Sequence, residues 1–313
     1  MATMTSATIP SGELFATANP LPRIVRVARL GPVLRASPTT AGVYGLDLTA
    51  GCAHGCPFCH IRGSSRYPGD ERLLFDPFTT DRLAVALDEL DMLPQHVVFS
   101  PSSDPLPPLR EVRSETLKAV QLLLSREVVV QIMTRGRFSP AMFETLASHR
   151  ERVKVAIAIT TLDKSLCRVL EPRAASPHGR VADIARLISA GVDVDARLEP
   201  LIPGRTDTRQ NLAPLFDSLA RAGVRRIVAH YLYLNNSVSD TLNAAIASLG
   251  WVERLRDDFD GGRVFRLGTV GPTKHLPLEI RRAGLARMIA LGAEFGLTVT
   301  TGSSQNPDLP RLG

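Results

Sequence analysis

The sequence predicts an α/β fold, a partial (β/α)6 TIM-type barrel of parallel strands with C-terminal covering elements. Apolar runs rich in Val, Ile and Ala alternate with longer amphipathic segments of helical period along most of the 313-residue chain. Several of these runs are continuously apolar, which is typical of strands in a parallel sheet that is covered on both faces. A chain of this length with 44% hydrophobic residues is sufficient for one such barrel.

Six strands and five helices are predicted to alternate along the chain. The strands are expected at Val43–Thr49, His96–Ser100, Val128–Thr134, Val153–Thr160, Val192–Glu199 and Arg225–Leu234. The helices are expected at Thr79–Leu93, Arg113–Ser125, Pro140–Arg150, Val181–Ala190 and Arg209–Ala222. Gly191 and Gly223 directly follow two of the predicted helices, where glycine commonly ends a helix. Repeated strand–helix units favour a parallel barrel over other α/β folds.

The segments on either side of these units complete the predicted organisation. We divide the chain into an N-terminal extension (1–40), the partial barrel (41–240) and C-terminal closure elements (241–313). The closure elements are a strand at Arg263–Leu267, a helix at Leu278–Phe295 and the apolar run Leu297–Thr301. The proline- and glycine-containing segment Glu171–Gly179 is expected to be a loop.

Composition limits the classes of partner and compartment. The net charge of +6 permits a nucleic-acid partner, but the arginines are scattered and only 5% of residues are aromatic, so a solvated basic surface explains the charge equally well. No apolar stretch is long enough to span a bilayer, so no membrane association is expected. The first 40 residues lack the apolar core of a secretory signal, and a cytoplasmic location is predicted.

Three of the four cysteines lie within eight residues of one another. Cys52, Cys56 and Cys59 form the pattern C-x3-C-x2-C, with Phe58 directly before the last cysteine. Three thiolates on one loop can hold an iron–sulfur cluster and leave one metal corner without a protein ligand. A disulfide would leave an odd thiol. A non-catalytic Cys3His zinc site with His54 or His60 remains an alternative, although structural zinc ligands usually come as two separated pairs.

Polar residues follow most of the predicted strands. The carboxyl ends of parallel barrel strands gather at one end of the barrel, where sites of this fold form. We therefore expect these residues to converge on the cysteine loop: Ser100–Asp104, Thr134–Arg135, Thr160–Thr161 and Glu199.

Together these features resemble the radical S-adenosylmethionine (SAM) enzymes, and within them the spore photoproduct lyase-like branch. The hallmark is C-x3-C-x-aromatic-C on the first strand–helix loop, and the resemblance extends from about Tyr44 to Asn235. Its further strings are SPSSDPLPP, TRG, ITTLDKSLCRVLEPRAASP and RLEPLIPGRTD. The resemblance implies a [4Fe-4S] cluster and SAM as cofactors, and reductive cleavage of SAM to a 5′-deoxyadenosyl radical in a lyase- or oxidoreductase-like reaction. It also implies a one-electron donor of flavodoxin or ferredoxin type, and a substrate that is a nucleic-acid lesion or a small molecule.

The same resemblance implies roles for individual residues. Cys52, Cys56 and Cys59 would ligate iron. The residues implied to contact SAM are Phe58 and Ile202 at the adenine, Ser102, Ser103 and Asp104 at the amino group, Arg135 at the carboxylate, Thr160 and Thr161 at the ribose, and Glu199 in the ring of strand ends. Glu171 and Arg173 would either contact SAM or cap the next helix.

Substrate contacts are less specified by the resemblance. The candidates are His60, Arg62, Tyr67, Tyr231, Tyr233 and Asn235. Photoproduct lyases carry a hydrogen-donating cysteine after the second strand, whereas residues 100–104 of this chain contain no thiol. Cys167 is expected to be a small buried hydrophobic residue, and no catalytic residue is assigned.

Overall fold

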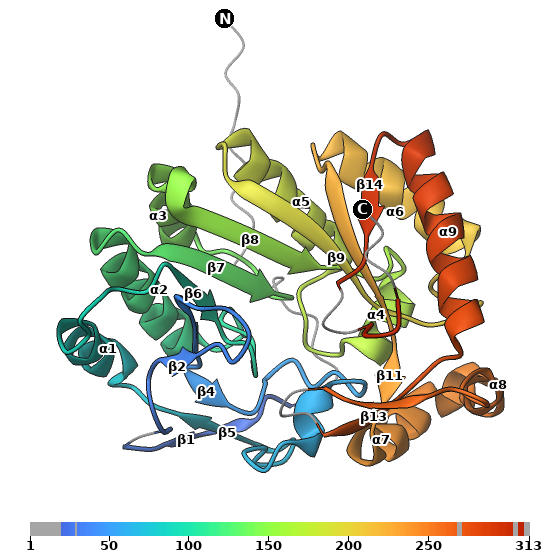
Figure 1. Ribbon diagram of the computed structural model, residues 1–313, viewed down its shortest axis with the longest axis horizontal. Helices are drawn as coiled ribbons and strands as arrows, with labels where there is room; N and C mark the ends of the chain where they lie inside the picture. The colour runs from blue at the N-terminus through green and yellow to red at the C-terminus, as the bar shows by residue number, and fades with distance from the viewer. Residues whose placement is uncertain (1–19, 29, 268–270, 303–305, 310–313) are drawn as a thin grey trace, which may run out of the picture.

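An open sheet of eight strands forms the centre of the computed structural model, which describes residues 20–28, 30–267, 271–302 and 306–309 (Figure 1). The strand order is β14-β10-β9-β8-β7-β6-β3-β2, and every neighbouring pair is parallel except β2 and β3. The strands are β2 (Arg35–Ala36), β3 (Val43–Leu46), β6 (His96–Phe99), β7 (Val129–Thr134), β8 (Val153–Ala158), β9 (Asp193–Leu201), β10 (Arg226–Tyr231) and β14 (Thr298–Thr300). The sheet does not close, so the predicted partial TIM-type barrel is confirmed.

The helices follow the strands and cover the outer face of the curved sheet, where α2, α3 and α5 lie behind the strands in Figure 1. The α-helices are α1 (Thr79–Asp88), α2 (Arg110–Ser125), α3 (Pro140–Ser148), α4 (Lys164–Leu170), α5 (Pro177–Ser189), α6 (Arg209–Arg221), α7 (Asn236–Ile246), α8 (Val252–Asp258) and α9 (Leu278–Glu294). Short 3-10 helices are η1 (His60–Gly63), η2 (Arg150–Arg152) and η3 (Ala247–Leu249). No helix in the described part of the chain is both long and apolar enough to cross a membrane.

Local sequence signals explain where several helices begin. The side chains of Ser139, Ser176 and Thr208 each accept a hydrogen bond from a backbone N–H in the first turn of α3, α5 and α6. A proline follows two of these caps, where its fixed φ suits the first helical position. For this reason α5 begins at Pro177, inside the segment predicted to be a loop.

Two small sheets lie below the main sheet in Figure 1. One has the order β1-β5-β4 and consists of β1 (Arg23–Arg26), β5 (Arg72–Phe75) and β4 (Thr49–Ala50). The other has the order β11-β13-β12 and consists of β11 (Tyr233–Leu234), β13 (Pro272–His275) and β12 (Val264–Arg266). Two predicted strands are therefore divided, because their last residues leave the main sheet and pair in a small one.

The C-terminal elements exist as predicted, but one of them enters the main sheet. β14 pairs in parallel with β10, with Arg226 opposite Thr298, so this run extends the barrel by one strand. The predicted strand Arg263–Leu267 forms β12 in a small sheet instead. Helices α7 and α8 were not predicted. The division into three domains remains a prediction.

A tight backbone contact fixes the turn that follows β7. A Cβ atom on Gly136 would lie 1.8 Å from the carbonyl oxygen of Leu106, so only glycine fits at this position. The Gly136 N–H donates a hydrogen bond to Thr134 Oγ1 at 2.8 Å. The turn therefore packs directly on the segment that follows β6, and residues at the ends of these two strands are held together.

Replacing Gly136 with alanine is expected to lower the free energy of unfolding by about 2–3 kcal/mol, because backbone must move to admit the methyl group. Denaturant unfolding of the apo-protein measures this. Gly261→Ala is the control, since no atom lies within 4 Å of its Cβ position and only its positive φ of 70° opposes alanine. The control should lose about 1 kcal/mol. An equal loss at the two positions would contradict the steric explanation.

His275 on β13 makes stability depend on pH. Its ring stacks on Tyr233 at 5.4 Å and meets Phe265 edge-on at 5.1 Å, and burial, aided by Arg281, lowers its pKa to about 4. The unfolded chain binds this proton near pH 6.5, so the stabilisation is complete above that pH and is lost as the pH falls towards 4. Burial lowers the pKa of His230 to about 4 as well, which adds a loss of the same sign.

We expect wild-type apo-protein to lose more stability than His275→Phe between pH 7 and pH 4.5. The difference between the two proteins should be about 2 kcal/mol, because phenylalanine keeps the ring contacts and binds no proton. Urea unfolding at both pH values measures the difference. Parallel pH profiles of the two proteins would rule out His275 as a source of the dependence.

Candidate functional site

The three clustered cysteines lie on the loop between β4 and η1. Cys56 is buried, Cys52 and Cys59 are half-buried, and all three line one cavity of about 360 Å³. Gly55 makes the turn between them with a φ of +66°, and a Cβ atom there would lie 2.1 Å from the Arg173 guanidinium. The positive φ therefore favours glycine at this position, and a larger residue would displace the end of the Arg173 side chain.

The predicted convergence of strand ends on this loop is present. The cavity is lined by residues that follow or end the parallel strands, namely Ser100–Asp104, Met133–Arg135, Ala156, Ala158, Arg197, Glu199, Pro200 and His230–Tyr233. Six of the nine predicted cofactor contacts line it: Phe58, Ser102, Ser103, Asp104, Arg135 and Glu199. Residues far apart in the sequence thus share one cavity with the cysteines.

Asp104 joins the strand ends to the cysteine loop. Its Oδ1 accepts hydrogen bonds from Leu106 N at 2.8 Å and Thr134 Oγ1 at 2.7 Å, and its Oδ2 accepts one from Arg135 N at 2.7 Å. His54 Nε2 lies 3.1 Å from Oδ2. Burial opposes ionisation, but the His54 ring and these donors lower the pKa of Asp104, so the carboxylate is charged. Both oxygens are therefore occupied by protein groups.

Arg135 is held in a defined orientation at the cavity wall. Its Nε donates to Glu171 Oε1 at 3.0 Å, and its Nη2 donates to the carbonyl of Glu199 at 2.7 Å. Its guanidinium carbon lies 5.3 Å from the centre of the Phe58 ring, a cation–π distance. Burial opposes its charge, but Glu171 and the other nearby acidic groups raise the pKa of Arg135. Nη1 has no hydrogen-bond partner among the described residues.

Two serine hydroxyls at the cavity wall are buried without a partner. Ser100 Oγ and Ser103 Oγ make no hydrogen bond within the described part of the chain, and Ser100 has an unusual φ of +51°. Both residues line the cavity. Buried hydroxyls are rarely left unpaired, so this pair is suited to a polar group of a ligand.

The thiols can ligate a metal only as thiolates. Burial raises the pKa of Cys52, Cys56 and Cys59, and Asp104 raises that of Cys52 further. A bound metal centre supplies the positive charge that keeps such thiols deprotonated. Thiolates that hold a four-iron cluster each bind a different iron atom, so three thiols on one loop are chemically suited to a cluster.

The two histidines of the zinc alternative differ in their surroundings. The ring of His54 is 1% exposed, with Nδ1 3.1 Å from the carbonyl of Arg173 and Nε2 facing Asp104. Both of its nitrogens thus face protein oxygens rather than the cysteines. His60 lines the cavity, and burial lowers its pKa.

Three predicted SAM contacts do not line this cavity. Thr160 Oγ1 donates to the carbonyl of Glu199 at 3.0 Å, Thr161 Oγ1 accepts from Asp163 N at 3.0 Å, and Ile202 N donates to Thr206 Oγ1 at 2.7 Å. All three side chains are buried. Thr160 joins the ends of β8 and β9, whereas the bonds of Thr161 and Ile202 lie within the loops that follow these strands. A direct role of the three residues in binding SAM remains a prediction.

Most predicted substrate contacts reach the cavity. His60, Arg62, Tyr67, Tyr231 and Tyr233 line it. Asn235 instead caps α7, accepting a hydrogen bond from Val238 N at 2.9 Å. Tyr231 donates its hydroxyl to Asp207 at 2.6 Å, so packing and this bond account for it.

Several site residues escaped the sequence reasoning. Arg197, His230 and Leu267 line the cavity. Arg197 donates to both carboxylate oxygens of Glu199, at 3.0 and 2.8 Å. Burial raises the pKa of Glu199, but Arg197 outweighs this effect and lowers the pKa to about 2. Arg197 precedes Glu199 by two positions on β9 and so shares its face, a signal that the sequence does contain.

Two proteins that match this chain in sequence are 23% and 25% identical to it. No family model matches the chain. An uncharacterized protein of Acidianus two-tailed virus is 23% identical over 204 residues, covering 61% of this chain and 67% of that protein. An uncharacterized protein of Mycobacterium tuberculosis is 25% identical over 208 residues, covering 62% of this chain. The match spans 60% of the mycobacterial protein, which is less than two thirds of its length.

Solved structures match over much more of the chain. A variant of spore photoproduct lyase matches with a TM-score of 0.68 and 15% identity, covering 88% of this chain and 81% of that one. Spore photoproduct lyase complexed with dinucleoside spore photoproduct matches with a TM-score of 0.65 and 13% identity, over 89% and 82%. SuiB of Streptococcus suis bound to SAM gives 0.54 and 13%, over 86% of this chain and 52% of SuiB. The chain therefore has the partial-barrel fold of the spore photoproduct lyase-like radical SAM enzymes, as the sequence predicted.

Proposed function

We propose that this protein is a radical SAM enzyme with a [4Fe-4S] cluster held by Cys52, Cys56 and Cys59. The observation that carries the proposal is the shared cavity, in which three thiols from one loop face an arginine with a free nitrogen and two unpaired serine hydroxyls. When bound, the cluster supplies one electron to the sulfonium of SAM, and the resulting 5′-deoxyadenosyl radical abstracts hydrogen from the substrate.

The chain's own residues would orient SAM in the cavity. Arg135 directs Nη1 at the carboxylate, a charge-assisted contact. Ser103, in the segment predicted to meet the amino group, offers a hydroxyl without a protein partner, and so does Ser100. Asp104 acts by fixing these strand ends, since both of its oxygens are occupied. Phe58 offers an apolar face for the adenine, with Arg135 packed against its ring.

Two observations bear on the substrate class, and they favour different substrates. Spore photoproduct lyase binds a dinucleoside photoproduct, which favours a nucleic-acid lesion, and the basic net charge is compatible with it. Residues 100–104 lack the thiol expected of photoproduct lyases, which favours a small molecule or natural product instead. The electron would come from a flavodoxin or ferredoxin in the cytoplasm.

Anaerobic protein reconstituted with iron and sulfide is expected to convert SAM to 5′-deoxyadenosine when dithionite is added. Cys56→Ala should lose iron and fall to the rate without protein, because two thiolates cannot hold the cluster. Chromatography of the nucleoside and iron analysis measure both effects. Cys167→Ser is the control for iron content, since Cys167 does not line the cavity and should retain the metal. A protein that holds iron and sulfide but never cleaves SAM would contradict the proposal.

The alternative function, non-catalytic zinc binding by a Cys3His set, predicts a different response to histidine replacement. His54 and His60 both line the cavity, but both ring nitrogens of His54 face protein oxygens. His60→Ala therefore removes the candidate ligand that is left, so a zinc site would lose its metal. We expect this variant to retain iron and sulfide at the wild-type ratio. Metal analysis of anaerobically purified protein distinguishes the two functions. One zinc per chain with neither iron nor sulfide, released by His60→Ala, would favour the alternative.

A further inference from the structure

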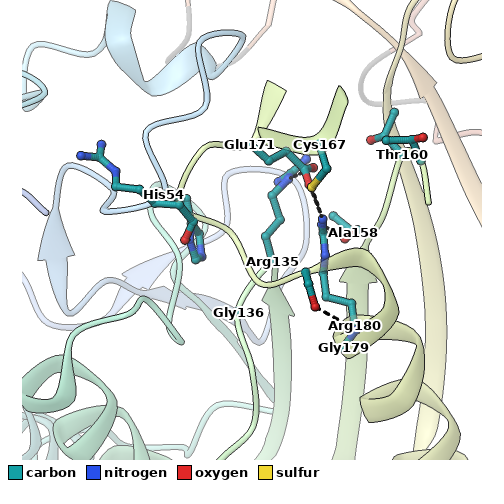
Figure 2. Close-up of polar contacts among 12 residues, drawn as sticks. His54, Arg135, Gly136, Ala158, Thr160, Cys167, Glu171, Gly179 and Arg180 are labelled. Carbon is teal, nitrogen blue, oxygen red and sulfur yellow. Dashed lines mark hydrogen bonds and ion pairs between the residues drawn. The ribbon is translucent and has the colours of Figure 1, made fainter. Parts of the chain in front are cut away.

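A single buried carboxylate joins Arg135 to a second arginine behind the cavity wall. Glu171 is 3% exposed and Arg180 is fully buried. Glu171 Oε1 accepts from Arg135 Nε at 3.0 Å, while its Oε2 pairs with Arg180 Nη2. Figure 2 shows both guanidinium groups reaching the same carboxylate from different elements. Glu171 is not among the residues that line the cavity, and its hydrogen bond to a residue of the cavity wall is the one with Arg135.

Arg180 and Cys167 hold the Glu171 carboxylate in place through its Oε2 atom. Arg180 Nη1 donates to the carbonyl of Ala158 at 2.5 Å, and its Nη2 lies 3.3 Å from Cys167 Sγ. The Cys167 thiol lies 3.5 Å from Glu171 Oε2, to which it donates. Burial opposes ionisation of Glu171, but Arg180 and Arg135 hold its pKa below the usual range. The network therefore contains two cations and one anion and keeps one net positive charge beside the cavity.

The orientation of Arg135 follows from this network. A free arginine side chain has many rotamers, and fixing them costs conformational entropy when a ligand binds. In Arg135, Nε donates to Glu171 and Nη2 donates to the carbonyl of Glu199, and the guanidinium packs against the Phe58 ring. Only Nη1 lacks a partner in the described residues, and it is therefore available to a ligand in the cavity.

We propose that Glu171 is a positioning residue that fixes the Arg135 guanidinium so that Nη1 faces an anionic group in the cavity, with Arg180 and Cys167 fixing Glu171 in turn. The identity of that anion as the SAM carboxylate rests on the proposed function. The geometry also explains Cys167, which does not line the cavity: its sulfur contacts both the Glu171 carboxylate and the Arg180 guanidinium.

The chain offers a matched control for replacing Glu171. Asp183 is 2% exposed and lies on α5, as Arg180 does. It pairs with Arg137, which lies in the same turn after β7 as Arg135, at 2.6 and 3.0 Å. Asp183→Asn thus removes an equally buried carboxylate from a neighbouring arginine and leaves the contacts of Arg135 in place. Glu171→Gln removes the charge from Arg135 while keeping the size of the side chain.

The first measurement uses apo-protein and does not depend on SAM. We expect the Arg135 Nε–H, followed by nitrogen-15 NMR, to exchange with solvent about tenfold faster in Glu171→Gln than in wild type, since a neutral acceptor binds a guanidinium less strongly. Asp183→Asn should exchange at the wild-type rate. If Glu171→Gln does not fold, Glu171→Gln/Arg180→Met restores the charge balance and should show the same faster exchange.

The second measurement is SAM affinity of the cluster-loaded protein. Glu171→Gln should raise the Kd for SAM by about 10- to 100-fold, the usual effect of removing a group that orients a ligand contact, without changing the cluster absorption spectrum. Cys167→Ser keeps a donor to Glu171 and should bind SAM as wild type does, whereas Cys167→Ala should bind it more weakly. Asp183→Asn should bind SAM normally.

The outcomes separate this inference from the proposed function. Wild-type exchange and wild-type SAM affinity in Glu171→Gln would overturn the positioning role, and so would equal losses in Glu171→Gln and Asp183→Asn. If loaded wild-type protein neither binds nor cleaves SAM while Arg135 exchange still depends on Glu171, the positioning role stands and the proposed function fails.

Discussion

The ion pair and hydrogen bonds of Asp104 are the interaction on which the site depends. The ends of β6 and β7 and the cysteine loop belong to segments far apart in the sequence, and each of them bonds or contacts this one carboxylate. A buried charge is costly unless its partners are well placed, so these partners must stay together for the fold to tolerate it. Gly136 completes the arrangement, because its missing side chain lets the β7 turn pack directly on Leu106.

The sequence predicts those elements whose signals lie in neighbouring residues. Apolar runs that alternate with amphipathic segments predict six strands of the main sheet, and the spacing of Cys52, Cys56 and Cys59 identifies the loop that lines the cavity. The pairing of β14 with β10 could not be predicted, because a short apolar run carries no mark of its partner. Glu171 and Thr160 show the same limit within the site. The resemblance implies a SAM contact for Thr160 and either a SAM contact or a helix cap for Glu171. Their partners are Arg135, Arg180 and the carbonyl of Glu199, which only the folded chain brings to them.

Arg135 and Arg197, two of the arginines that line the cavity, differ in how far their charge is compensated. Arg197 is paired with both oxygens of Glu199, so that pair is neutral. Arg135 lines the cavity and shares Glu171 with Arg180, so its cluster keeps one positive charge. An anionic group therefore gains most beside Arg135 and Phe58, next to the cysteine loop. The wall at Arg197 and Glu199 is a compensated pair, beside which a neutral polar group gains more than an anion does.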